Sequence, residues 1–254
     1  GYGPLKELFD GGRCQIGAHL HPWVCPPFDE QIGNLNSYPG NLPRALEKAK
    51  LECLTEEIGK RFGRRPTIYE AGRYGVGPNT AAILAELGYE IDASVVPRTD
   101  FRIDEGPDFR HCGAEPYWFG DNRLLEIPLS AGFTGAFTGL GWDGWNRINT
   151  PAGRAMRLTA ISSRLRLLDR VVLTPEGITH EEHRRLTRKM LDSGHRVFSF
   201  TYHSPSLEPG CTPYVRNHDD LALFLDRLDR YFDYFINEVG GRPSTPHEIL
   251  SLLS

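Results

Sequence analysis

The pattern of apolar and polar positions divides this chain into two kinds of segment, one typical of strands and one typical of helices. Short apolar runs bounded by turn residues predict strands over residues 14–20, 67–69, 90–96, 124–129, 171–173 and 196–203. Longer segments with apolar residues three and four positions apart predict helices over residues 43–62, 79–87, 151–168, 179–191 and 219–235, and a short last helix from residue 245. Strands that alternate with helices indicate an α/β fold with a mainly parallel sheet.

Local signals mark where two of these helices begin and end. Pro43 lies near the first turn of its helix, where a missing N–H costs nothing, and Gly63 follows the end of that helix. Thr179 and Glu182 have the spacing of a capping box. The remaining long stretches predict irregular loops over residues 24–40, 98–122 and 131–150.

The most informative short segment is residues 17–23, Gly-Ala-His-Leu-His-Pro-Trp. Side chains two apart on a strand point to the same face, so we expect His19 and His21 to lie side by side. Pro22 ends the strand, because proline has no N–H to donate to a ladder. Two imidazoles on one face are a start on a divalent metal site. The alternative interpretation is a polar strand face, or one buried histidine beside an exposed one.

Three further polar residues, Arg73, Asp92 and His203, each stand just after an apolar, strand-like run. Each has an ordinary structural interpretation: a surface ion pair for Arg73, a turn cap for Asp92, and a buried, hydrogen-bonded position for His203. Together with the two histidines, they are predicted to gather at the carboxyl end of a parallel sheet. Active sites of α/β enzymes lie at that end.

Four segments together resemble the motifs of polysaccharide deacetylases of the NodB-homology superfamily (carbohydrate esterase family four), with the WalW-type branch the most similar. Residues 17–23 resemble the metal-histidine motif, although its more familiar form separates the histidines by three residues. Residues 69–75 resemble the arginine motif, residues 89–94 the aspartate motif, and residues 200–210 the last motif, which contains a histidine. The resemblance covers nearly the whole chain and implies a distorted (β/α) barrel with fewer than eight strands, in a single domain over residues 1–254.

The resemblance implies metal-dependent hydrolysis of the amide of N-acetylated sugars in a polysaccharide, during exopolysaccharide synthesis or modification. It implies that His19 and His21 are ligands of a divalent metal, with zinc the expected ion. His203 would be the general acid that protonates the leaving amine, and Asp92 would orient or charge-stabilise a catalytic group. Arg73 completes the implied catalytic set.

Aromatic residues near these motifs are candidates for stacking on the sugar rings of a glycan substrate. They are Trp23, Tyr74 and Trp142. Ordinary anchoring of the loops by these rings is the alternative. Backbone N–H groups near Tyr74 are candidates for stabilising an oxyanion.

Two departures from the family pattern bear on activity. The acidic motif that supplies a base and a third metal ligand is not found, and residues 2–10 instead predict the end of a helix, so we expect the chain to lack the first βα segment. Glu70 stands where the usual arginine would fall, unless Arg73 replaces it. A catalytic zinc keeps three protein ligands, so two histidines alone predict weak metal binding and little activity. A non-catalytic glycan-binding protein and a C–N hydrolase of small molecules are the alternative functions.

Composition narrows the class of protein further. The 254 residues are 39% hydrophobic and 24% charged, a profile that supports a large buried core. The net charge of −4, without a basic stripe, argues against nucleic-acid binding. No stretch has the length of a membrane span, no signal peptide opens the chain, and the five scattered cysteines are expected to be free thiols. These features favour a cytoplasmic location, and they leave the oligomeric state open.

Overall fold

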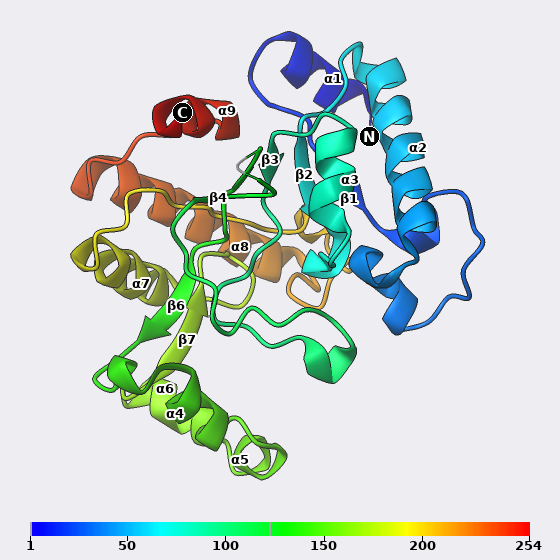
Figure 1. The fold of residues 1–254 in the computed structure, drawn as a ribbon. Helices are drawn as coiled ribbons and strands as arrows, with labels where there is room; N and C mark the ends of the chain where they lie inside the picture. The colour runs from blue at the N-terminus through cyan, green and yellow to red at the C-terminus, as the bar shows by residue number, and fades with distance from the viewer. Residues whose placement is uncertain (1, 122) are drawn as a thin grey trace. The chain divides into compact units, whose positions relative to one another are not determined.

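Parallel strands with helices between them form the first of two units in the computed structural model, which describes residues 2–121 and 123–254 (Figure 1). This unit runs to Pro128 and also contains Ser244–Ser254, whereas the second unit is Leu129–Pro243. The elements of the first unit are α1 (Tyr2–Asp10), β1 (Ala18–Leu20), α2 (Arg44–Phe62), β2 (Ile68–Ala71), α3 (Thr80–Glu86), β3 (Ile91–Asp92), β4 (Tyr117–Phe119), β5 (Leu124–Glu126) and α9 (Pro246–Leu253).

The five strands of the first unit are arranged in the order β1-β2-β3-β5-β4. Neighbouring strands are parallel except for β4, which pairs antiparallel with β5. The mixed α/β class with a mainly parallel sheet is thereby confirmed for this unit. The distorted barrel and the single domain stay predictions.

Alternation along the strands separates an apolar face of this sheet from a polar one. Ala18 and Leu20 of β1 and Tyr69 and Ala71 of β2 are buried in one cluster with apolar residues of α2 and α3. The residues between them in sequence, including His19, point to the other face because successive side chains alternate. The helix predicted from residue 43 begins at Arg44 and ends, as expected, at a glycine C-cap, since Gly63 adopts φ 75°.

The second unit contains a two-stranded antiparallel sheet and a set of helices. Its elements are β6 (Ala131–Thr134), α4 (Gly141–Ile148), α5 (Pro151–Ala155), α6 (Leu158–Arg164), β7 (Asp169–Val172), α7 (His180–Asp192) and α8 (His218–Asp233). The capping box predicted at Thr179 and Glu182 is present at the start of α7. Helices α4, α5 and α6 lie together, and α7 lies beside α8 (Figure 1).

Several sequence predictions are corrected in detail. The glycine-rich stretch 131–150 was expected to be a loop but contains β6 and α4. The helix predicted over 151–168 is two short helices, because Arg157 between them has φ 56° and breaks the helical path. The first strand is shorter than 14–20, and the strand predicted over 90–96 ends at Asp92.

The predicted strand over residues 196–203 is wrong, since no ladder forms over this segment among the described residues. It makes single backbone hydrogen bonds, such as Thr201 N–H to the Leu173 carbonyl at 3.0 Å. The N–H of Ser199 is taken by the side-chain hydroxyl of Ser130 at 2.9 Å, so a side chain replaces the backbone carbonyl that a ladder needs. His203 therefore does not end a strand of the parallel sheet.

A buried lysine fixes the loop that follows β1. Lys50 of α2 is fully buried, and its ammonium forms an ion pair with Glu30 at 2.9 Å. The same Nζ donates to the carbonyl oxygens of Pro22 at 3.1 Å, Cys25 at 2.7 Å and Pro27 at 2.5 Å. A buried charge is tolerated only when it is paired and hydrogen-bonded, so Lys50 and the loop require each other.

We predict that Lys50→Met lowers the free energy of unfolding by about 3–5 kcal/mol, because Glu30 would remain buried without its cation. Urea unfolding monitored by circular dichroism measures this loss. The double variant Lys50→Met with Glu30→Gln should recover part of it. Lys60→Met, at an exposed lysine of the same helix, is the matched control. A loss no larger than that of the control would contradict the role of Lys50.

Candidate functional site

The two histidines of the 17–23 segment lie side by side, as the strand spacing predicted. Their ring centroids are 4.5 Å apart with nearly perpendicular planes, and Trp23 packs on His21 at 4.5 Å. His19 is exposed, and its Nδ1 lies 3.0 Å from the backbone carbonyl of Glu70, to which it can donate. A metal-binding imidazole commonly donates its second N–H to a carbonyl in this way, which leaves Nε2 as the ligating nitrogen.

The turn after β2 packs directly against this histidine segment. A Cβ on Gly72 would stand 2.3 Å from the Leu20 carbonyl oxygen and 2.5 Å from Nδ1 of His21, so only glycine fits. The next two residues, Arg73 and Tyr74, adopt φ values of 55° and 59°. Two successive non-glycine residues in the left-handed region cost free energy, and such strain often occurs at functional sites. The carboxyl ends of β1 and β2 are thus brought together as expected.

Arg73 binds the long loop between β1 and α2. Its guanidinium donates to Asn34 Oδ1 at 2.8 Å and to the Ser37 hydroxyl, and it lies 4.2 Å from the ring centroid of Tyr38. These contacts hold the loop 34–38 over the turn at Gly72–Tyr74. The surface ion pair considered from sequence is not among them, and the catalytic role of Arg73 stays a prediction.

Asp92 is the last residue of β3 and faces the opposite side of the sheet from His19. Its register partners are Tyr69 on β2 and Glu126 on β5, whereas His19 is in register with Glu70. Asp92 and Glu126 are 2% and 1% exposed, which makes them a buried carboxyl pair. Ser94 donates its hydroxyl to Asp92, and Glu126 Oε1 accepts the N–H of Val95 at 2.9 Å.

Burial raises the pKa values of both carboxyl groups of this pair. Burial raises the pKa of Asp92 to about 7, although the hydroxyl and N–H of Ser94 oppose this shift. Burial, and then the charge of Asp92, raise the pKa of Glu126 well above its usual range. The pair consequently keeps at least one proton at neutral pH. On α2, burial likewise raises the pKa of Glu47 to about 7.

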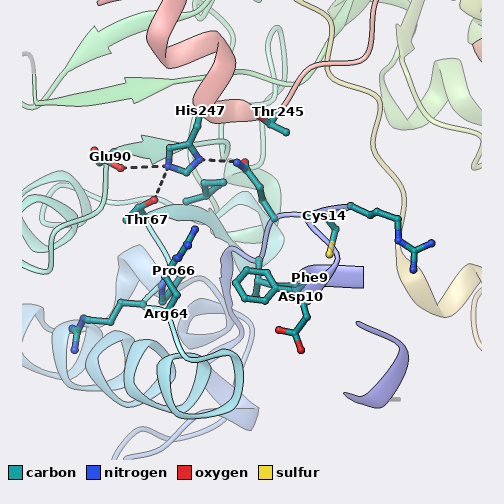
Figure 2. A pocket seen from close by; sticks show the side chains of 15 residues that line it. Phe9, Asp10, Cys14, Arg64, Pro66, Thr67, Glu90, Thr245 and His247 are labelled. Carbon is teal, nitrogen blue, oxygen red and sulfur yellow. Dashed lines mark hydrogen bonds and ion pairs between the residues drawn. The ribbon is translucent and has the colours of Figure 1, made fainter. Parts of the chain in front are cut away.

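Two cavities are lined by described residues of the first unit. A cavity of about 410 Å³ is lined by His19, Glu70 and residues of the α9 start. A larger one, of about 850 Å³, lies where the chain enters β1, β2 and β3. Figure 2 shows His247 in its wall, where the ring contacts Thr67 at 2.8 Å and Glu90 at 3.3 Å. His247, Thr67 and Glu90 are thus joined to one another by hydrogen bonds. The larger cavity lies at the amino ends of the strands, whereas the turn at Gly72–Tyr74 lies at their carboxyl ends.

The second unit holds His203 in a carboxylate–imidazole pair. Nδ1 of His203 lies 2.8 Å from Oε2 of Glu176, and the backbone N–H of His203 donates to Oε1 at 3.1 Å. The Ser206 hydroxyl also donates to Oε1, at 2.5 Å. The side chain of Glu176 is 6% exposed and that of His203 is 60% exposed. A buried carboxylate therefore orients an imidazole that is open to solvent.

Opposing effects act on Glu176. Burial by itself would raise the pKa of the carboxyl, but the hydrogen bonds from His203 and Ser206 outweigh burial and hold the pKa below its usual value. Glu176 is consequently ionised at neutral pH. Since Nδ1 of His203 faces this carboxylate, Nε2 is the nitrogen that would exchange a proton with a ligand.

The three aromatic candidates occur in different surroundings. Trp23 is 38% exposed, whereas Tyr74 stacks on Phe101 with centroids 6.1 Å apart. Trp142 was expected in a loop but lies on α4 of the second unit, and its indole Nε1 is buried. Trp23 is consequently the most exposed of the three, and binding of sugars by any of them stays a prediction.

The described residues do not complete a metal site around the two histidines. His19 and His21 offer two imidazoles in a suitable arrangement, but no group of three or more His, Cys, Asp or Glu residues in the described chain is placed to hold an ion. A catalytic zinc needs three protein ligands, so these two residues do not by themselves form such a site. No chemical step is assigned to a metal.

Sequence reasoning missed three residues that the structure makes important: Lys50, Glu126 and Glu176. Glu126 is a charged residue within an otherwise apolar predicted strand, which is a signal of a special environment. Glu176 stands in Thr-Pro-Glu-Gly just after an apolar strand, the same signal that pointed to Arg73. Lys50 stands within a helix of ordinary pattern, and nothing in the sequence marks it as buried.

Comparison with known proteins gives weak likenesses. No protein-family profile matches the sequence, and no curated protein matches it. Among solved structures, a proposed polysaccharide deacetylase from Mycobacterium smegmatis is similar over 51% of this chain, with 22% identity and a TM-score of 0.35. A GH57 branching enzyme from Thermococcus kodakaraensis, solved with glucose, is similar over 100% of this chain, with 12% identity and a TM-score of 0.48.

The chain spans 36% of the length of the first of these proteins and 49% of the second. Neither TM-score is high enough to establish a shared fold. No helix among residues 2–121 and 123–254 is both long enough and apolar enough to cross a bilayer.

We predict that stability falls as the pH rises from about 4 to about 7. Unfolded Asp and Glu titrate near 4, whereas Asp92 and Glu47 titrate at about 7 in the folded chain, so the folded state binds more protons in this window. Each group should remove on the order of a few kcal/mol across the window. Urea unfolding at several pH values measures this slope.

Asp92→Asn and Glu47→Gln should each flatten this pH dependence, because the amide does not ionise. Glu56→Gln, at an exposed position of α2, should leave the slope unchanged. A wild-type stability that rises over the same pH window would contradict the raised pKa values.

We predict weak binding of zinc. Titration calorimetry with zinc chloride should give a binding free energy well short of the about 10–16 kcal/mol of four-ligand structural zinc. His19→Ala and His21→Ala should each abolish it, and His111→Ala, at an exposed loop position, should not. Tight binding that survives His19→Ala would place the metal elsewhere.

Proposed function

We propose that this chain belongs to a hydrolase of the polysaccharide-deacetylase type, which removes acetyl groups from N-acetylated sugars of a glycan. The observation that carries the proposal is the 2.8 Å contact between the buried Glu176 carboxylate and Nδ1 of the exposed His203. An imidazole held by a carboxylate is a competent general acid at neutral pH. The four sequence motifs that resemble this superfamily support the choice of substrate.

In the proposed reaction, water adds to the acetamide carbon and loses a proton to the solvent, and the C–N bond then breaks, which yields acetate and a free amine on the sugar. His203 in its protonated form donates the proton from Nε2 to the leaving nitrogen. The Glu176 carboxylate stabilises the imidazolium and keeps its ring oriented, without taking the proton itself. The metal dependence, the WalW-type branch, the distorted barrel and the role in exopolysaccharide modification are parts of the same proposal.

The second candidate function is a glycan-binding protein without catalysis. It is favoured by the finding that the described residues bring no third ligand to His19 and His21. In that case His203 would make a hydrogen bond to a sugar hydroxyl instead of transferring a proton. Activity measurements on matched variants separate the two functions.

We predict that the chain, supplied with a divalent ion, releases acetate from N-acetylated chito-oligosaccharides. His203→Ala should lower kcat by about 10²–10⁴-fold, since it removes the general acid. Glu176→Gln should lower kcat between about tenfold and 10⁴-fold and change the pH profile. Glu181→Gln, at an exposed glutamate of α7 outside the four motif segments, should keep wild-type activity. Glycan binding without acetate release would favour the non-catalytic function.

A further inference from the structure

The segment that carries Glu176 has no regular structure of its own. Thr174, Pro175 and Glu176 follow β7 and precede α7, outside any helix or strand. Backbone N–H and C=O groups outside a helix or ladder need other hydrogen-bond partners, which side chains can supply. The Glu176 carboxylate can stay against His203 only if side chains from other elements hold this segment in place.

His183 of α7 holds the first carbonyl of this segment. The ring is fully buried, and its Nε2 lies 2.7 Å from the Thr174 oxygen. A carbonyl only accepts, so Nε2 must carry the proton and the neutral ring has a single tautomer. Burial lowers the pKa of His183, which keeps the ring neutral. Edge contacts at 5.3 Å with Phe200 and Tyr231 fix the plane of the ring.

Arg227 of α8 holds the second carbonyl. Its guanidinium Nη1 donates to the Pro175 oxygen at 2.9 Å. Two successive carbonyls are thus bound by donors from two different helices, immediately before Glu176. This arrangement fixes both the position and the direction of the chain at that residue.

The contacts of Glu176 depend on this placement. One carboxylate oxygen accepts from the His203 N–H and the Ser206 hydroxyl, and the other faces His203 Nδ1. Carboxylate–imidazole contacts are sensitive to displacements of an ångström or less, because hydrogen bonds weaken steeply with distance and angle. Movement of the 174–176 segment would loosen the orientation of His203.

We propose that His183 and Arg227 are positioning residues that hold Glu176 on His203 and thereby raise the affinity of His203 for its proton. The inference rests on the proposed function only for its catalytic meaning, because the pairing itself can be measured without activity. In this arrangement, one residue of α7 and one residue of α8 keep the buried Glu176 carboxylate in contact with the exposed His203 ring.

The test is an NMR titration of the His203 ring Cε1–H signal in the full chain. Glu176→Gln removes the charge of the carboxylate altogether and so gives the largest expected change. It should lower the proton affinity of His203 by at least about tenfold. His183→Leu and Arg227→Met should each lower the affinity by about threefold to tenfold. His183→Gln and Arg227→Lys, which retain a donor, should restore most of it. Arg230→Met, one turn further along α8, is the matched control and should leave it unchanged.

Thermal unfolding accompanies each titration. If His183→Leu does not fold, Arg227→Met carries the test, because this side chain is only partly buried. The inference is overturned if Arg227→Met and the folded His183 variants titrate like the wild type while Glu176→Gln does not. If the titrations shift as expected and no acetate is released, the positioning role holds and the proposed function fails.

Discussion

The ammonium of Lys50, buried against the loop after β1, is the interaction on which the histidine segment depends. Three backbone carbonyls and Glu30 surround it, so the loop that begins at Pro22 cannot leave α2 without exposing a charge to an apolar interior. His21 directly precedes that loop. The backbone that directly follows the histidine pair is therefore fixed by a lysine that is distant in sequence and has no part in the proposed chemistry.

The end of β2 is held against the same segment, because Gly72 lies close to Leu20 and His21. Because no Cβ fits between the Leu20 carbonyl and the His21 ring, the turn after β2 is locked onto the turn after β1. Arg73 then reaches from the strained turn to Asn34 and Tyr38, and so it fixes the long loop from the other side. One lysine and one arginine thus order a stretch that is rich in turn residues and has little regular structure.

In the second unit, a buried carboxylate rather than a buried ammonium fixes an irregular segment of the chain. Glu176 is buried and ionised, and its stability depends on three hydrogen bonds from residues 203 and 206. The consequence for His203 is a ring orientation fixed by the contact of Nδ1 with Glu176. In the first unit the buried acids Asp92 and Glu126 behave oppositely, because burial, and for Glu126 also the charge of Asp92, raises their pKa values.

The sequence by itself determined the α/β alternation, the helix caps and the pairing of His19 with His21, because these follow from local periodicity and backbone chemistry. It also placed Asp92 and Arg73 at the carboxyl ends of strands. Only the tertiary structure decided that Asp92 faces away from His19. The face to which the Asp92 side chain points depends on the register of β3 against β2, and β3 has only two residues. The tertiary structure likewise decided that residues 196–203 form no ladder and that Glu176 is the partner of His203. Both outcomes arise from contacts between residues far apart in sequence, which no local pattern encodes.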